Sequence, residues 1–316
     1  MVKRKLKKKV KRKLILLIIL IIGISVGIKS YKTYKYHQTY EYKLLQINYT
    51  KEEAKLLTDN LNGSQIDNLL NEKKNTTLLN ILQEKYYLKK NLERYLDYYN
   101  KNTNLSTSEI VSLVNVNRDK DYYENMEETD TSIGFGFLVN KYHALNESYE
   151  VSDLTTISKT YSYGDNQKLN KEAYEAFKNL ADAAKEEGHT ILIVSSYRSH
   201  QRQDEVWKDY KASFGIKKAD NYAARAGSSE HETGIAIDVA DYNDKNDKFD
   251  ETESYKWMLE NSYKYGYILR YPKNKENITG YAYEAWHYRY LGVDLATKVH
   301  NEGITYDEYY EYYLNK

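Results

Sequence analysis

An uninterrupted apolar run lies close to the amino terminus. Residues Leu14–Ile28 read LILLIILIIGISVGI without a charge, and Lys29 ends the run. A helix of this length spans about 22 Å, less than the roughly 30 Å hydrocarbon core of a bilayer. Lys13 and Lys29 would therefore have to extend their ammonium groups to the two interfaces. The pattern predicts a retained transmembrane anchor, and a cleaved secretory signal is the alternative.

The distribution of charge predicts which side of the membrane the body occupies. Nine Lys and Arg residues and no acidic residue fall within residues 1–13, whereas the rest of the chain carries 38 basic and 46 acidic groups. Basic residues beside an apolar helix stay in the cytoplasm, so everything after Lys29 is expected outside the cell. We therefore expect a single-pass protein of the cell membrane with an extracellular body, or a secreted protein if the segment is cleaved.

Composition also excludes several functions. An acidic body with a basic tip lacks the basic face that phosphate binding needs, so no nucleic-acid partner is expected. The chain contains no cysteine, which removes disulfides, iron–sulfur clusters, thiol nucleophiles and every zinc site built on thiolates.

Four consecutive regions are predicted along the chain. Residues 1–29 form the cytoplasmic basic tip and the anchor. Residues 30–49 are polar and aromatic without a clear period, which is typical of a stalk. Residues 50–130 carry short helical patterns and form a small helical module, either a spacer or a domain that binds the cell wall or a partner. Residues 131–316 differ in their pattern of apolar and polar residues, and they form the main domain.

The helical module shows start signals and apolar stripes. Thr50 with Glu53, and Ser106 with Glu109, have the spacing of a capping box before an apolar run. Leucines and a tyrosine at helical spacing predict one longer helix across Leu78–Tyr98. The stripes are typical of ordinary core positions.

The main domain mixes helices and strands without regular alternation. Asn170 is the expected N-cap of a helix that ends at Gly188, and another helix is expected near Glu253–Tyr263. This order indicates an α+β fold, a small antiparallel sheet flanked by helices, rather than a doubly wound sheet. Strands are predicted at Thr190–Ser195, Ile235–Val239, Tyr267–Tyr271 and Tyr283–Tyr290.

Chemistry-bearing residues gather on two of these strands and the loop before one of them. On a regular strand at 235–239, Asp238 faces away from the isoleucines, and a carboxylate on a mostly buried strand needs a partner or a metal. His231 precedes this strand, and Glu284 lies three residues before His287. Two imidazoles and one carboxylate are a ligand set for catalytic zinc, and a separate glutamate can serve as the base.

Each of these residues also has an ordinary interpretation. His231 could be a surface loop histidine, Asp238 a strand-end cap or salt-bridge partner, and Glu284 with His287 an exposed pair. On a regular strand positions 284 and 287 also point to opposite faces. Either a bulge or bend interrupts the strand there, or one of the two residues is not at the site.

Three motifs in this order resemble the VanY-type D-alanyl-D-alanine carboxypeptidases, which are zinc peptidases of bacterial peptidoglycan. The segment SSEHETGIAIDVA is similar to their Ser-x-His-x-x-Gly-x-x-x-Asp signature, EAWHYRY resembles their Glu-x-Trp-His motif, and SSYRSHQRQ resembles Ser-Gly-Tyr-Arg-Ser-x-x-x-Gln. The resemblance covers about residues 131–316. This sequence departs from the pattern at Ser196, where glycine is usual, and at Ala285, where proline is common.

The resemblance implies roles for seven residues of this chain. His231, Asp238 and His287 would bind zinc, and Glu284 would be the catalytic base. The terminal carboxylate and the scissile carbonyl of the substrate would be held by Arg198, Gln203 and Ser229. A guanidinium fork suits a free carboxylate, which is how an exopeptidase recognises the end of a chain.

The implied function is removal of the terminal D-alanine from peptidoglycan stem peptides, with zinc as cofactor. An L,D-carboxypeptidase that acts on tetrapeptide stems fits the same motifs. A lytic endopeptidase suits a tethered chain less well. From a different class, a non-catalytic wall-binding domain on the same fold remains an alternative.

Overall fold

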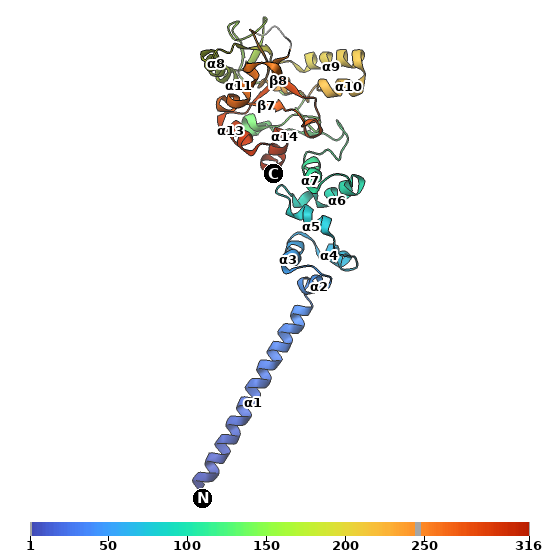
Figure 1. Cartoon of the computed structure of the whole chain (residues 1–316), viewed down its shortest axis with the longest axis vertical. Helices are drawn as coiled ribbons and strands as arrows, with labels where there is room; N and C mark the ends of the chain where they lie inside the picture. The colour runs from blue at the N-terminus through green and yellow to red at the C-terminus, as the bar shows by residue number, and fades with distance from the viewer. Residues whose placement is uncertain (1, 244–247, 316) are drawn as a thin grey trace. The chain divides into compact units, whose positions relative to one another are not determined.

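The computed structural model describes residues 2–243 and 248–315, and side chains from residue 7 onward within those ranges. The chain forms two compact units, Met1–Lys89 and Lys90–Lys316 (Figure 1). The predicted domain boundaries stay predictions.

The first unit consists of helices. They are α1 (Val2–His37), α2 (Tyr40–Gln46), α3 (Lys51–Asn60), α4 (Gly63–Leu70) and α5 (Thr76–Gln83). Thr50 caps α3 with the predicted capping box, in which its side chain accepts from the Glu53 amide and the Glu53 carboxylate accepts from the Thr50 amide. Helix α1 runs on into the predicted stalk.

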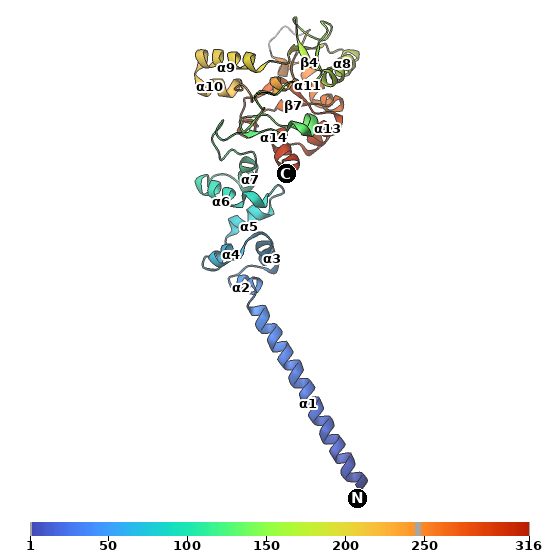
Figure 2. The same cartoon turned by 180° about the vertical axis from the view of Figure 1, so that it is seen from behind.

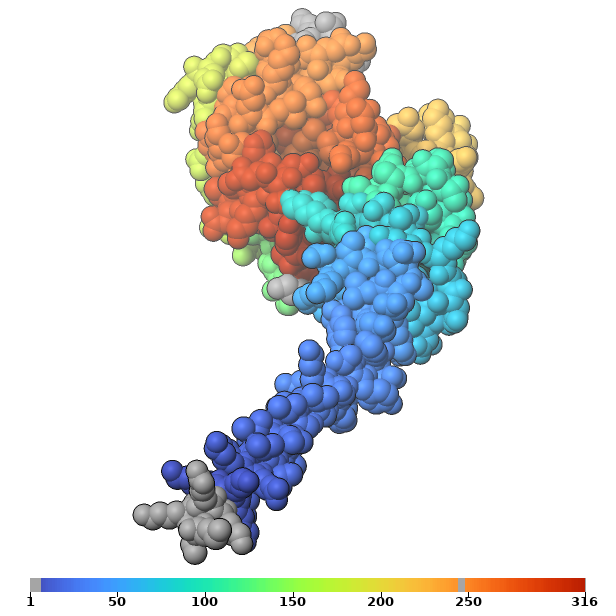
Figure 3. All heavy atoms as spheres, turned by 60° about the horizontal axis from the view of Figure 1, so that its bottom comes forward, coloured from blue at the N-terminus to red at the C-terminus, as the bar shows by residue number. Residues whose placement is uncertain are grey.

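The apolar run lies inside α1. Within the described residues, Lys7–His37 is the one stretch of helix long and apolar enough to cross a membrane. Its side chains are exposed, and they form the blue column at the lower left of Figure 3. An isolated helix with this much exposed apolar surface has the length and composition of either a membrane anchor or a secretory signal.

The single helix predicted across Leu78–Tyr98 is wrong. Helix α5 ends at Gln83, where Glu84 takes an extended conformation (φ −63°, ψ 139°). The chain resumes with a 3₁₀ turn, Lys89–Asn91, and then α6. The turn residues Lys89 and Lys90 lie between the apolar residues of the two halves, so the apolar positions belong to two short stripes.

The second unit contains one main sheet of four strands. Its order is β5-β6-β8-β7, and every neighbouring pair is antiparallel. This confirms the α+β class and the small antiparallel sheet. The strands are β5 (Ile191–Ser195), β6 (Ala236–Asp241), β7 (Tyr267–Tyr271) and β8 (Glu284–Tyr290), and shorter strands are β1 (Glu127–Glu128), β2 (His143–Ala144), β3 (Leu154–Thr156) and β4 (Lys168–Asn170).

The second unit also contains α-helices, and some of them pack on the main sheet. Asn170 caps α8 as predicted, because its side chain accepts from the Glu172 and Ala173 amides. Figures 1 and 2 show α9 and α10 as a pair that projects from the rest of the unit. The helices are α6 (Leu92–Lys101), α7 (Thr107–Asn115), α8 (Lys171–Glu186), α9 (His200–Phe214), α10 (Ile216–Tyr222), α11 (Glu253–Asn261), α12 (Glu276–Thr279), α13 (Val293–Glu302) and α14 (Tyr306–Tyr309).

The two faces of the sheet have different characters. One face packs on α8, and the buried cluster there includes Phe177, Leu180, Ile193, Ile237 and Val239. Burying such side chains is the main stabilising contribution of this layer, about 1.5–3 kcal/mol for each large one. The opposite face carries polar and charged side chains at alternating positions, which are Asp238, Arg270, His287 and Arg289. The chemistry of the unit is therefore concentrated on one face of the sheet.

A bulge interrupts β8 between Glu284 and Tyr288, which is the first of the two alternatives left open by the sequence. Leu269 pairs with Tyr288 and Tyr271 pairs with Glu284, so two residue steps on β7 face four on β8. Trp286 is pushed outward and is 41% exposed. The bulge brings Glu284 and His287 to the same side, with Glu284 Oε2 3.6 Å from His287 Nδ1.

Candidate active site

Three residues predicted as metal ligands lie together on the polar face of the sheet. Asp238 and His287 are direct cross-strand partners on β6 and β8. His231 comes from a short 3₁₀ turn, Glu230–Thr233, that leads into β6. One potential ligand atom from each of the three lies within 4.8 Å of the others. Strand pairing thus brings together two residues that are 49 positions apart in the sequence.

Hydrogen bonds orient both imidazoles toward Asp238. His231 Nδ1 lies 2.8 Å from the Ser196 carbonyl oxygen and donates to it, which leaves Nε2 free and 3.3 Å from Asp238 Oδ2. His287 donates from Nε2 to Glu230 Oε2 at 3.3 Å, and its Nδ1 lies 3.0 Å from Asp238 Oδ1. Two ring nitrogens and one carboxylate therefore point at one space, and this donor set fits a tetrahedral zinc ion with one open position.

The protonation of these groups follows from burial and mutual contact. Burial opposes ionisation of Asp238, but His231 and His287 outweigh it and hold the pKa of that carboxyl well below its usual range. Burial lowers the pKa of His231. For His287 burial is outweighed by hydrogen bonds to Asp238 and Glu230, which raise the pKa to about 9 in the metal-free protein. Metal binding at His287 must therefore displace a proton.

The turn that holds His231 depends on a glycine. Gly234 ends the turn in the left-handed conformation (φ 70°, ψ 14°). A Cβ at this position would lie 2.5 Å from Val151 Cγ1, so both the backbone and the space require glycine. The His231 carbonyl in turn accepts from the Arg198 amide at 3.1 Å. This contact joins the ligand turn to the segment that carries the predicted carboxylate pocket.

Glu284 lies beside the three candidate metal ligands and is not one of them. Burial is the main reason why its pKa is raised, to about 7, and the negative charges of Asp238 and Glu230 add to the effect. His287 and Arg198 oppose the rise. A carboxyl that titrates near neutral pH is suited to accept a proton and return it.

Arg198 and Gln203 lie at the start of the projecting helix pair. Arg198 follows β5, and its Nη1 donates to Gln203 Oε1 at 2.9 Å while Nη2 donates to Ser195 Oγ at 3.2 Å. Arg198 Nη2 also lies 3.6 Å from Asp238 Oδ2. Gln203 is buried, and its Nε2 donates to the Ala224 carbonyl oxygen at 2.7 Å. Both ends of Gln203 are thus engaged in holding Arg198 and the following loop.

All seven predicted site residues line one cavity of about 300 Å³. The buried Ser229 lies next to the ligand turn and lines this cavity. Tyr271, Tyr281 and Trp286 supply aromatic walls. The cavity is large enough for the end of a peptide and combines a cationic group, a potential metal site and the largely buried carboxyl of Glu284.

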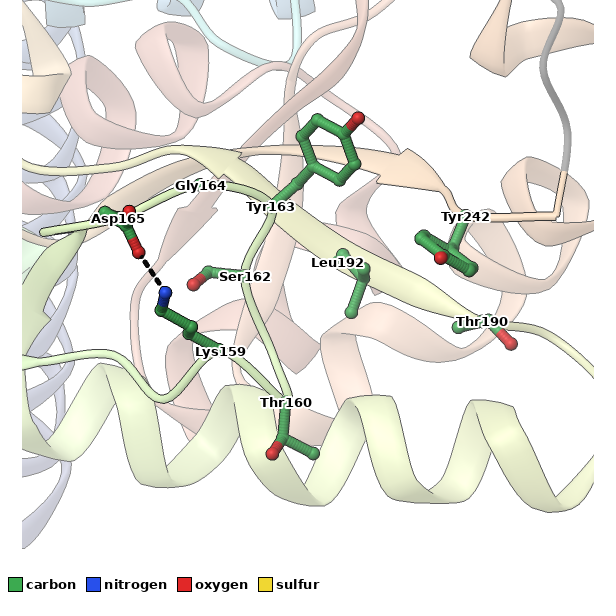
Figure 4. A pocket seen from close by; sticks show the side chains of 9 residues that line it. All are labelled: Lys159, Thr160, Ser162, Tyr163, Gly164, Asp165, Thr190, Leu192 and Tyr242. Carbon is green, nitrogen blue, oxygen red and sulfur yellow. Dashed lines mark ion pairs between the residues drawn. The ribbon is translucent and has the colours of Figure 1, made fainter.

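A larger hollow of about 550 Å³ lies away from this chemistry. Figure 4 shows it at the outer edge of β5, with the ion pair between Lys159 and Asp165 on one side and Tyr163 and Tyr242 on the other. None of the predicted site residues lines it, and its lining contains no histidine.

Sequence reasoning missed a buried ionic cluster beneath the site. Glu230 accepts from Arg270 Nε at 2.6 Å and from Arg289 Nη1 at 3.0 Å, and all three side chains are buried. Arg270 also pairs with Asp307. A signal was present, because Arg270 and Arg289 stand in the apolar strands YILRY and WHYRY, where a charge needs a partner.

Acid is expected to destabilise the fold through this cluster. Burial opposes ionisation of Glu230, but Arg270 and Arg289 outweigh it and hold its pKa well below the usual range. Such a carboxylate stabilises the fold above its unfolded pKa of about 4.3, and the contribution is lost as pH falls toward the folded value. The urea concentration at the midpoint of unfolding, measured with a chelator present, should therefore decrease as the pH is lowered below about 5. Glu230→Gln should show a smaller fall, and an equal fall would assign the effect to other carboxyls.

Known proteins resemble this chain over the same region. The family model described as VanY, D-alanyl-D-alanine carboxypeptidase, matches residues 166–293. A putative carboxypeptidase of Bacillus subtilis, YodJ, is 43% identical over 180 residues, which cover 55% of this chain and 66% of that protein. A D-alanyl-D-alanine carboxypeptidase of Enterococcus faecium is 30% identical over 238 residues, which cover 69% of this chain and 75% of that protein.

Solved structures are also similar to this chain. The LdcB LD-carboxypeptidase, whose structure concerns peptidoglycan recognition, is 39% identical with a TM-score of 0.56, over 60% of this chain and 91% of that one. A mutant VanY D,D-pentapeptidase of a VanB-type cassette, in complex with Zn(II), is 32% identical with a TM-score of 0.47, over 54% and 96%. This chain belongs to the VanY family of D-alanyl-D-alanine carboxypeptidases.

Proposed function

We propose that this chain is a zinc-dependent carboxypeptidase that removes the terminal D-alanine from peptidoglycan stem peptides outside the cell. The observation that carries the proposal is the convergence of His231 Nε2, His287 Nδ1 and the Asp238 carboxylate, with the separate carboxyl of Glu284 beside them. Family membership supports the same activity.

Each residue has a distinct task in this mechanism. His231, Asp238 and His287 would hold zinc, which when bound polarises a carbonyl and lowers the pKa of a bound water to about 7. Glu284 accepts the proton of the attacking water and passes it to the leaving amine. Arg198 fixes the terminal carboxylate of the substrate, so that the last peptide bond lies at the ligand group, and Gln203 holds Arg198 in place. Ser229, which lines the cavity wall, contacts the scissile carbonyl in this mechanism.

Arg198→Ala is expected to reduce kcat/KM for peptides with a free terminal carboxylate far more than for the amidated peptides. Losing one partner of a buried charge pair costs about 2 kcal/mol or more, which is a fall of about 30-fold. The check is a comparison of both substrates with the variant and with Arg202→Ala, because Arg202 lies four residues further along, in the first turn of α9, but is exposed and pairs with Glu205. Equal losses on both substrates would place the carboxylate pocket elsewhere.

The decisive assay measures release of D-alanine from pentapeptide and tetrapeptide stems, with and without a chelator. Release from the pentapeptide that the chelator abolishes and added zinc restores is the expected result. Release from the tetrapeptide instead would identify an L,D-carboxypeptidase, which LdcB makes the second candidate by its name and its 39% identity. Binding to cell walls without release from either peptide would favour the non-catalytic alternative.

We also propose that α1 anchors the chain, with residues 1–29 as cytoplasmic tip and span, 30–49 as stalk, 50–130 as a helical spacer and 131–316 as the catalytic domain. The support is the apolar helix with its basic flank. The test is the intact mass of the protein extracted from membranes, since cleavage would remove the basic tip.

A further inference from the structure

Glu230 connects a proposed metal ligand to the interior of the domain. Its Oε2 lies 3.3 Å from His287 Nε2, on the side of the ring that faces away from Asp238. Its Oε1 accepts from two guanidinium groups, those of Arg270 and Arg289. The side chain is fully buried. A carboxylate held from two sides in this way has little freedom to move, and neither has the ring that donates to it.

The two arginines are themselves fixed by other parts of the fold. Arg289 donates through Nη2 to the carbonyl oxygens of Phe135 and Phe137, at 3.0 and 2.8 Å. Arg270 donates to both carboxylate oxygens of Asp307 on α14. The chain of contacts thus extends from His287 through a strand of the sheet to a helix near the carboxyl terminus.

Asp307 is in turn tied to a segment that precedes the sheet. Asn140 Nδ2 donates to Asp307 Oδ1 at 2.8 Å, and both side chains are buried. Asn140 and Asp307 both lie outside residues 166–293, the region that the family model matches. The support of the proposed ligand His287 therefore includes parts of the chain that lie beyond the motifs.

We propose that Glu230 is a positioning residue for His287, and that Asp307 acts through Arg270 to hold Glu230. Glu230 accepts a hydrogen bond from the Nε2–H group of His287. This contact keeps the ring proton on Nε2 and turns Nδ1 toward the space shared with Asp238 and His231. This inference rests on the proposed zinc site. Outer carboxylate partners of metal-bound imidazoles raise the basicity of the ligand and restrict its rotation, and their loss typically weakens metal affinity by about 10–100-fold.

The chain offers a matched control on the same turn. Glu232 is also a buried glutamate, but its carboxylate accepts from the Gly227 amide and contacts His200 Nδ1 at 2.9 Å. Among the contacts that the structure describes, none joins it to His231, Asp238 or His287. Replacing Glu232 therefore tests the loss of a buried carboxylate from this turn without the loss of the contact to His287.

The experiment measures zinc affinity of the full-length chain by competition with a chromophoric chelator. Glu230→Gln should bind zinc about 10–100-fold more weakly, and Asp307→Asn should show a smaller loss in the same direction. Glu232→Gln should bind zinc as the unchanged chain does. Equal zinc affinity of Glu230→Gln and the unchanged chain would overturn the proposal, even if unfolding by urea showed that the variant is less stable.

A measurement on the unchanged chain covers the case in which Glu230→Gln does not fold. Nitrogen NMR of the histidine rings, with zinc bound, should show the proton of His287 on Nε2 and that of His231 on Nδ1. A proton on Nδ1 of His287 would overturn the proposal. If zinc affinity changes among the variants as expected but the unchanged chain releases no D-alanine, the proposed function fails and this inference stands. If the unchanged chain binds no zinc, both are contradicted.

Discussion

Replacing Glu284 by glutamine is expected to lower kcat by about 10²–10⁴-fold and to leave one zinc ion bound per chain. The largely buried Glu284 carboxyl lies 3.6 Å from His287 Nδ1 but is not one of the three residues that could hold a metal together. Glutamine keeps the shape of the side chain and cannot accept a proton. The attacking water then loses its proposed proton acceptor, while the three candidate metal ligands are unchanged. Turnover and metal content of the purified variant check both halves of this expectation.

An exposed glutamate provides the control for this variant. Glu276→Gln changes the same chemical group at the start of α12, away from the cavity, and should leave both turnover and zinc unchanged. Loss of zinc from Glu284→Gln would mean that Glu284 is a ligand. Unchanged turnover would mean that another group accepts the proton.

Turnover of the unchanged chain should also fall on the acid side, at a pH below the pKa of about 7 that Glu284 has without metal. Burial raises the pKa of Glu284 to about 7 in the metal-free protein, and only the carboxylate form can accept the proton of water. Bound zinc would move this acid limb to lower pH, because a nearby cation favours the carboxylate. The residual turnover of Glu284→Gln should not show this fall at acid pH.

Replacing Asp238 by alanine is expected to remove both zinc and turnover. Asp238 supplies the one carboxylate of the ligand group and lies between the two imidazoles, 3.3 Å from His231 Nε2 and 3.0 Å from His287 Nδ1. Its loss also leaves Arg198, 3.6 Å away, as an uncompensated cation beside the site. Both effects oppose a divalent cation, so zinc affinity should fall by more than about 100-fold, the upper range for an outer partner.

Asp241→Asn is the matched control, because Asp241 ends the same strand and contacts Asn243 and Ser254 instead. It should keep both zinc and D-alanine release. Metal analysis after dialysis, together with the D-alanine assay, distinguishes the two variants. Retention of zinc by Asp238→Ala would show that the three residues do not act as one ligand group.

The sequence by itself determined the local elements of the main domain and the identity of the candidate residues. The four strands of the main sheet, the helix capped by Asn170 and the Thr50 capping box follow from local patterns, and all are present. These features depend on neighbours within a few residues, so sequence spacing predicts them well. The prediction of one helix across Leu78–Tyr98 was wrong for a related reason. The apolar residues of two short helices have nearly the same spacing as those of one long helix.

Only the tertiary structure decided how the site is assembled. The incompatible positions of Glu284 and His287 showed that a bulge was needed if both belong to the site, but the pairing of β8 with β7 determines that it exists and where it lies. The tautomers of His231 and His287, and the burial of Glu230 between two arginines, depend on contacts between residues far apart in the chain. A buried charge is tolerated only where the whole fold brings its partners together, and residue order along the chain does not specify that distance.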